Sequence, residues 1–116
     1  MRHRNKIKSL GRKKAPRELM LRNLASSILI YEKVKTTKAK ARAVKPLLER
    51  VITYARKNDL AAKKRIIEII PQKLAAKKAI EVIGARYKDR KGGYTRVTKL
   101  GMRQGDAAEI VQIELV

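Results

Sequence analysis

The chain of 116 residues contains no cysteine, no tryptophan and no phenylalanine, and its aromatic rings are four tyrosines and one histidine. Without cysteine it has neither a disulfide framework nor a thiolate zinc site. Acidic residues are also scarce, with 10 Asp and Glu against 31 Lys and Arg, and the net charge is +21. The molecule therefore carries a large positive charge that its own carboxylates do not balance.

Long hydrophobic runs are missing as well. The longest stretch without a charged residue, 23–31, has nine residues, whereas a helix needs about 20 to span a bilayer. A secretory signal would place an apolar run of roughly 7 to 15 residues behind the basic start, and here charges recur through Arg22. We expect a cytoplasmic protein without a membrane helix.

What is present is 44% apolar residues in a chain of single-domain length, which is too much for a fully disordered tail. A charge of +21 weakens a compact state by self-repulsion unless a polyanion neutralises it. The composition therefore indicates a folded basic protein that binds phosphates.

The basic charge is concentrated first at the N-terminus. Residues 1–14 contain no acid and few large apolar side chains, so we expect 1–15 to be an extended arm and 16–116 a single globular domain. Seven of these residues are cationic: Arg2, Arg4, Lys6, Lys8, Arg12, Lys13 and Lys14.

Helical spacing of apolar residues dominates the first two thirds of the domain. A helix is expected from Pro16, with Glu18 in its first turn, to about Tyr31, followed by a short strand at 32–36. Thr37 can cap a second helix, which Pro46 must kink or restart. The apolar stripe of that helix is Ala41, Val44, Leu48, Val51, Ile52 and Ala55.

Two further helices are predicted at 60–70, capped by Asn58 or Asp59 and ended by Pro71, and at 72–83. Gly84 is expected to end the latter in a left-handed conformation. Its apolar face is predicted to comprise Ala75, Ala79, Val82 and Ile83, with Lys73, Lys77 and Lys78 in solvent.

The C-terminal third favours strands at 94–100 and 110–116, joined by turn residues Gly101, Gly105 and Asp106. An antiparallel hairpin is expected, which the strand at 32–36 can extend. The predicted fold class is α/β (α+β): several amphipathic helices packed on a small, mostly antiparallel three-stranded sheet, with an extended basic N-terminal arm.

A second basic concentration lies in 86–103, where seven Lys and Arg accompany one acid. Gly92 and Gly93 would let backbone amides approach a phosphate, with charge from Arg90, Lys91 and Arg96. The alternative is that the two glycines only permit a tight entry into the strand. Tyr87 and Tyr94 could stack on unpaired bases, although packing at the rim of the core is the commoner role.

The sequence contains few residues or motifs that could support catalysis. The single histidine, His3, lies in the arm without a fixed partner to orient it, so we interpret it as a further RNA contact or as a residue without a specific role. No segment matches a P-loop or a dinucleotide fingerprint, and the carboxylates are scattered. We expect no enzyme activity, cofactor, metal or small-molecule substrate.

Several motifs, in order and in register, resemble those of the bacterial large-subunit ribosomal protein seventeen family. They are the opening Met1 to Arg4, Arg22-Asn23-Leu24, Lys35-Thr36-Thr37, Gly92 to Arg96, Lys99-Leu100-Gly101, Gly105 to Ala108, and Ile113-Glu114-Leu115. The resemblance implies a non-catalytic constituent of the large ribosomal subunit, bound to its ribosomal RNA beside other ribosomal proteins and supporting subunit assembly and translation.

The predicted mechanism is electrostatic clamping of folded RNA by the arm and the Gly-rich loop. The RNA-contacting residues are expected to be Arg2, His3, Arg4, Lys6, Lys8, Arg12, Lys13, Lys14, Arg17, Arg22, Asn23, Arg90, Lys91, Gly92, Gly93, Tyr94, Arg96 and Arg103. A nucleoid-type DNA-binding protein is the main alternative, because phosphate neutralisation alone does not separate DNA from RNA. A membrane-surface protein is a third, although the helices lack Trp and Phe anchors.

Overall fold

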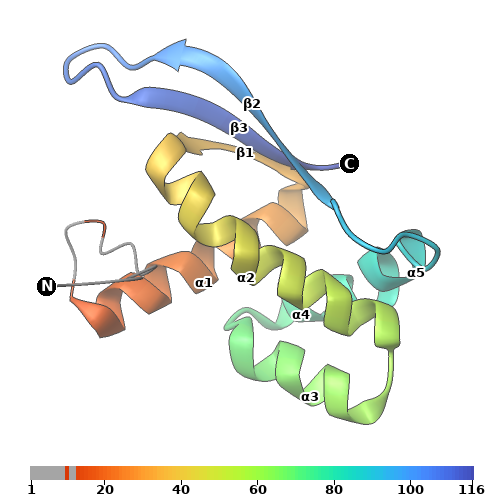
Figure 1. The fold of residues 1–116 in the computed structure, drawn as a ribbon. Helices are drawn as coiled ribbons and strands as arrows, with labels where there is room; N and C mark the ends of the chain where they lie inside the picture. Colours follow the sequence, from red (N-terminus) through yellow and green to blue (C-terminus); the bar gives the residue numbers. More distant parts are fainter. Residues whose placement is uncertain (1–9, 11–12) are drawn as a thin grey trace, which may run out of the picture.

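The structure of the chain is a computed structural model that describes residue 10 and residues 13–116. Helices and strands follow the predicted order, and the hairpin and β1 lie over helices α1 and α2 (Figure 1). The predicted α+β class is therefore confirmed. The elements are α1 (Lys14–Tyr31), β1 (Lys33–Thr37), α2 (Lys38–Lys57), α3 (Leu60–Ile69), α4 (Lys73–Lys78), the π-helical turn η1 (Ala79–Ile83), α5 (Gly84–Arg86), β2 (Thr95–Met102) and β3 (Glu109–Leu115).

Helix α1 begins two residues earlier than its sequence signals suggest. Pro16 is its third residue and Glu18 lies beyond the first turn, which holds no acid, so both predicted positions were wrong. The end at Tyr31 is confirmed. There Glu32 takes a left-handed conformation, with a φ of 66°, and its amide donates to the Ile28 carbonyl.

Helix α2 forms the centre of the molecule, and its predicted apolar stripe is confirmed in full, since all six residues are buried. The Thr37 hydroxyl accepts a hydrogen bond from the Lys40 amide, which gives the predicted cap. The helix is assigned without interruption through Pro46, so it does not restart there.

Helix α3 is capped by Asp59, whose carboxylate accepts from the Ala62 amide at 2.7 Å. The next predicted helix is longer than expected, because α4, η1 and α5 follow one another without a break to Arg86. Gly84 does not end it: its backbone is right-handed helical. A Cβ atom built there would lie 2.4 Å from the Ala55 carbonyl oxygen, so glycine is needed for the close approach of two helices.

Two side chains of this helical segment also differ from expectation. The π-helical turn holds more residues than an α-turn, which rotates Val82 into solvent while Ala75, Ala79 and Ile83 stay buried. Lys78 is not a solvated surface lysine. Its ammonium donates to the Ile30 carbonyl at 2.7 Å and to the Glu32 carboxylate at 3.1 Å, and so it ties α4 to the end of α1.

The sheet has the strand order β1-β3-β2, and both pairings are antiparallel, as predicted. Val111 and Ile113 of β3 are buried against the helices, and Leu115 packs at the edge of the same core. Gly101 is not in the connecting turn but in β2, at a register shift with a φ of 134°. Gly105 and Asp106 do lie in the turn.

Candidate nucleic-acid interface

The described part of the first basic region is the beginning of α1. Lys13, Lys14, Arg22 and Asn23 are exposed, and Arg17 is half-buried. None of the four cations has an acidic partner among the residues that the structure describes. The other predicted contacts of this region lie outside the described residues: Arg2, His3, Arg4, Lys6, Lys8 and Arg12.

The second region is the loop between α5 and β2, residues 87–94, which we call the basic loop. Lys88, Arg90 and Lys91 are exposed there. Gly92 and Gly93 are exposed too, and Gly93 has a φ of +61°, which favours glycine. The Arg90 side chain folds back so that its Nε donates to the Gly92 carbonyl at 3.0 Å. The glycines thus fit the turn into β2 and leave backbone open to a ligand.

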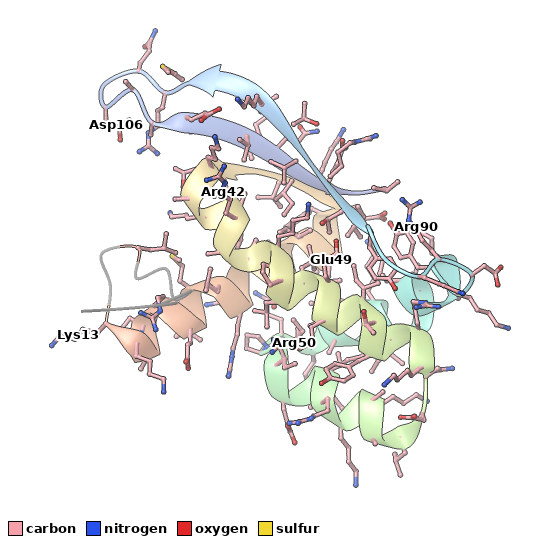
Figure 2. All side chains as sticks on the ribbon, in the orientation of Figure 1. Lys13, Arg42, Glu49, Arg50, Arg90 and Asp106 are labelled. Carbon is pink, nitrogen blue, oxygen red and sulfur yellow. The ribbon has the colours of Figure 1, made fainter. Side chains whose placement is uncertain are left out.

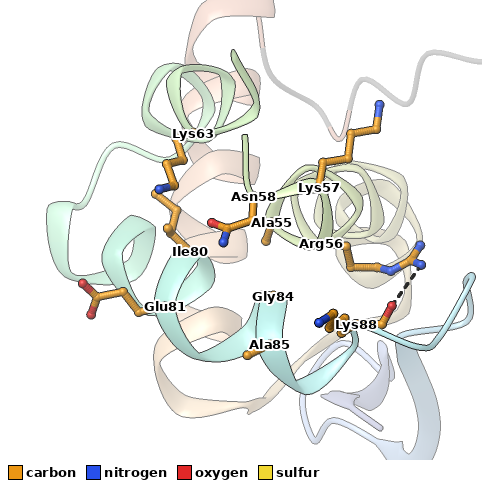
Figure 3. Close-up of a pocket in the computed structure, with 10 residues that line it drawn as sticks. All are labelled: Ala55, Arg56, Lys57, Asn58, Lys63, Ile80, Glu81, Gly84, Ala85 and Lys88. Carbon is orange, nitrogen blue, oxygen red and sulfur yellow. Dashed lines mark hydrogen bonds between the residues drawn. The ribbon is translucent and has the colours of Figure 1, made fainter. Parts of the chain in front are cut away.

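Arg56 of α2 holds the basic loop from beneath. Its guanidinium donates to the Tyr94 hydroxyl at 3.0 Å. It also donates to the Lys88 carbonyl at 3.3 Å (Figure 3). The Tyr94 hydroxyl in turn donates to the Arg90 carbonyl at 3.2 Å. The loop is therefore fastened at both ends, which presents its exposed cations in a fixed arrangement.

Glu49 fixes the point where the basic loop enters β2. Its carboxylate accepts hydrogen bonds from the Tyr94 and Thr95 amides, each at 3.3 Å, and from the Thr95 hydroxyl at 2.8 Å. A carboxylate that receives three donors is a strong anchor. Neither Glu49 nor Arg56 stood out in the sequence, because a single charged residue on a helix signals nothing about a partner from a distant segment.

The two tyrosines of the basic loop belong to the core. Their rings are 5.3 Å apart, and Tyr94 is 1% exposed. The Tyr87 hydroxyl donates to the Val116 carbonyl at 2.6 Å. Tyr87 and Tyr94 therefore pack in the core, which was the alternative to base stacking, and neither ring offers a free face to a base.

Four of the seven cations in 86–103 are engaged by carboxylates. Arg86 pairs with Glu32, Arg96 with Glu114, Lys99 with Glu109 and Arg103 with Asp106. The Arg103 guanidinium and the Ala108 amide lower the pKa of Asp106 to about 2, and hydrogen bonds from Arg86 and Lys78 lower the pKa of Glu32 to about 2. Within 86–103, the cations without a carboxylate partner among the described residues are therefore Lys88, Arg90 and Lys91.

The two basic regions lie far apart. Figure 2 shows Lys13 and Arg90 at opposite ends of the molecule, with Asp106 at the tip of the hairpin away from Arg90. The longest dimension of the molecule is 44 Å. Among the described residues, the predicted contacts therefore do not form one continuous patch, and a ligand that touches both the start of α1 and the basic loop must be large.

A pocket of about 570 Å³ lies beside the basic loop, between the end of α2, α3 and the η1–α5 segment (Figure 3). Ala55 and Gly84 line it where the two helices meet. Its charged lining residues are Arg56, Lys57, Lys63, Lys88 and Glu81. This excess of cations extends the positive surface of the basic loop along the end of α2.

Within the described residues, no group of three or more His, Asp or Glu side chains could hold a metal ion. No helix in the same part of the chain combines the length and the apolar character needed to cross a bilayer.

The family model for ribosomal protein L17 matches residues 20–116. This chain belongs to the ribosomal protein L17 family. The large ribosomal subunit protein bL17 of Rickettsia bellii is 46% identical over 116 residues, which cover 100% of this chain and 82% of the relative. The protein of the same name from Desulforudis audaxviator is 44% identical over 92% of this chain and 96% of its own length.

Membership of the ribosomal protein L17 family confirms the resemblance seen in the sequence motifs. Proteins of this family are structural, non-enzymatic constituents of the large ribosomal subunit, which in bacteria is cytoplasmic. The predictions of a non-enzyme and of a large-subunit protein are thereby confirmed, and the alternatives of a nucleoid protein and a membrane-surface protein lose their support. The family model begins at residue 20, so the basic arm lies outside its match.

Proposed function

We propose that this member of the ribosomal protein L17 family binds large-subunit ribosomal RNA through two separate basic regions, the N-terminal arm with the start of α1 and the basic loop. The observation that carries the proposal is the fixed presentation of Lys88, Arg90 and Lys91, which have no carboxylate partner among the described residues. Cations held in place without counter-charges attract phosphates more strongly than cations already paired.

The first region contributes the arm, residues 1–15, together with Arg17, Arg22 and Asn23 of α1. Removing the arm would take away cations but little apolar surface, so its purpose is charge neutralisation rather than folding. Its His3 is an additional hydrogen-bonding group for RNA. Arginine and lysine side chains from this region neutralise phosphates where RNA segments come together.

We give different weights to the remaining predicted contacts. Arg96 and Arg103 share their charge with Glu114 and Asp106, so they serve as secondary contacts. Tyr94 acts indirectly, by holding the loop through its hydroxyl. Gly92 and Gly93 offer backbone amides at an exposed turn, where a phosphate oxygen can approach closely.

Because the start of α1 and the basic loop lie at opposite ends of the molecule, the protein acts as a brace between RNA segments. Clamping two segments at a fixed distance supports subunit assembly without sequence-specific base readout. Neighbouring large-subunit proteins are the expected partners on the surfaces that RNA does not cover.

The test is binding of a structured large-subunit ribosomal RNA fragment over a range of salt concentrations. The variant carries Arg90→Gln and Lys91→Gln, and the logarithmic salt slope is expected to fall by roughly 1.5, at 0.7 to 0.9 per lost phosphate contact. Both side chains are exposed, so the variant should fold normally.

A control variant carries Arg50→Gln on α2 and Lys64→Gln on α3, two exposed cations outside the pocket beside the basic loop, and removes the same charge. It should change the slope much less. Equal loss in the two variants would mean that net charge, rather than the basic loop, determines affinity. Duplex DNA of equal length at matched salt is the competitor that separates RNA binding from general polyanion binding.

A further inference from the structure

An apolar groove is lined by residues of α3 and of the α4–η1 segment. Figure 1 shows α3 and α4 on the side of the molecule away from the β2–β3 hairpin. The volume of the groove is about 480 Å³, and its apolar lining comes from Ile67, Ile70, Pro71, Ala76 and Ile80. Ile67 is an aliphatic residue in the last turn of α3, yet its side chain is 63% exposed. An exposed aliphatic surface of this kind, rimmed by charge, is typical of an interaction site.

Charges run along one side of this α3–α4 groove. Lys73, Lys77 and Glu81 follow at a spacing of four residues on the helical segment, and all three are exposed. No ion pair joins any of them to another residue in the part of the chain that the structure describes. The groove therefore offers an aliphatic floor beside two unpaired cations followed by one anion.

RNA does not fit this chemistry. The lining contains no aromatic ring on which a base could stack. Burying a base edge against isoleucine and proline would leave its donors and acceptors without hydrogen-bond partners, which is costly. Phosphates could contact the two lysines, but the aliphatic residues of the groove would then stay exposed to water.

We infer that the α3–α4 groove binds a segment of a neighbouring ribosomal protein, in which an aliphatic side chain enters the groove and carboxylates lie opposite Lys73 and Lys77. The inference rests on the proposed function for its setting, because it assumes that the RNA contacts bring the protein into the subunit. It assigns the opposite side of the molecule from the hairpin to a protein partner rather than to RNA.

The experiment is a competition for incorporation into large subunits assembled from purified ribosomal RNA and proteins. Tagged Ile67→Glu and untagged wild-type chain are supplied in equal amounts, and their ratio in the finished particles is measured. The variant is expected to be under-represented by roughly tenfold or more, since burial of one isoleucine contributes at least a factor of ten to an association constant. Leu60→Glu is the matched control, because Leu60 is on the same helix, is 71% exposed and does not line the groove.

A photo-crosslinking benzoylphenylalanine at position 67 identifies the occupant in the same particles. The expected product is a peptide in which an aliphatic residue is flanked by Asp or Glu. A crosslink to nucleotides, a crosslink to a peptide without carboxylates, or equal incorporation of Ile67→Glu and wild type would overturn the inference. If Ile67→Glu fails to fold, Lys73→Glu with Lys77→Glu takes its place in the competition.

Binding to the naked ribosomal RNA fragment separates this inference from the proposed function. Ile67→Glu should bind the fragment as wild type does, and weaker binding would mean that the groove contacts RNA. If the wild-type chain itself fails to bind the fragment, the proposed function is wrong, whereas the crosslink still decides what fills the groove.

Discussion

The Glu49 carboxylate accepts a hydrogen bond of 2.8 Å from the Thr95 hydroxyl, across 46 residues of sequence. The contact joins the middle of α2 to the first residue of β2, directly after the basic loop. The same carboxylate also accepts from the amides of Tyr94 and Thr95. A single acidic side chain thereby links the central helix, the hairpin and the surface proposed to bind RNA.

Glu49→Ala is expected to destabilise the fold by about 1 to 3 kcal/mol, because three donors of the buried residues Tyr94 and Thr95 lose their acceptor. The free energy of unfolding from urea titration measures the effect. Glu68→Ala is the control, since Glu68 forms an exposed ion pair with Arg65 and should cost well under about 1 kcal/mol. Similar losses in both variants would show that Glu49 is not an anchor.

The approach of Gly84 to Ala55 gives a second prediction. Gly84→Ala would place a Cβ atom 2.4 Å from a backbone oxygen, so α2 and the α4–α5 segment must separate. The expected loss is about 1 to 3 kcal/mol, as for other overpacked cores. Gly92→Ala should leave the melting temperature almost unchanged, because nothing lies within 4 Å of a Cβ atom there. Equal melting temperatures for both variants and the wild type would contradict this account.

The sequence predicted what depends on periodicity. The six buried residues of α2 recur at helical spacing, and the apolar residues Val111, Ile113 and Leu115 alternate in β3, so these elements and the α+β class can be inferred from the sequence. The Thr37 cap was predictable because it is a local contact. The capping hydrogen bond joins residues only three apart, so the sequence alone indicates it.

Contacts between residues far apart in the sequence could not be predicted from it. Gly84 looks like a helix terminator until the Ala55 carbonyl is found against it. Lys78 looks solvated until the ends of α1 and α4 meet. Likewise, Arg96 looked like a free cation, and only the register of the hairpin brings Glu114 to it, whereas the partner of Arg103 is Asp106, three residues further along the chain. The basic loop was predicted as a site, but not which of its cations remain unpaired.

The Glu32 carboxylate makes the free energy of unfolding depend on pH. Hydrogen bonds from Arg86 and Lys78 lower its pKa from 4.5 to about 2. A lowered folded-state pKa means that the ion pairs contribute stability above pH 4.5 and that this contribution is lost as the pH falls toward 2. Since the Glu32 side chain is 38% exposed, solvent screening limits the contribution to about 1 kcal/mol.

Glu32→Gln should therefore be less stable than the wild type at pH 7 and equally stable near pH 2. Chemical denaturation between these two pH values measures the difference, with Glu81→Gln as a control for removal of an exposed carboxylate. A constant difference between Glu32→Gln and the wild type across the whole range would show that the ion pairs are not its cause.

Deletion of residues 2–12 separates RNA binding from folding. The segment carries Arg2, Arg4, Lys6, Lys8 and Arg12, whereas α1 and every buried residue of the described core lie beyond it. The helical circular-dichroism signal should therefore remain, while the salt slope for ribosomal RNA falls by as much as roughly 4, at 0.7 to 0.9 for each phosphate contact. Incorporation into large subunits should be lost. A large drop in helical signal would mean that the arm belongs to the folded core, and an unchanged salt slope would mean that the arm does not contact phosphates.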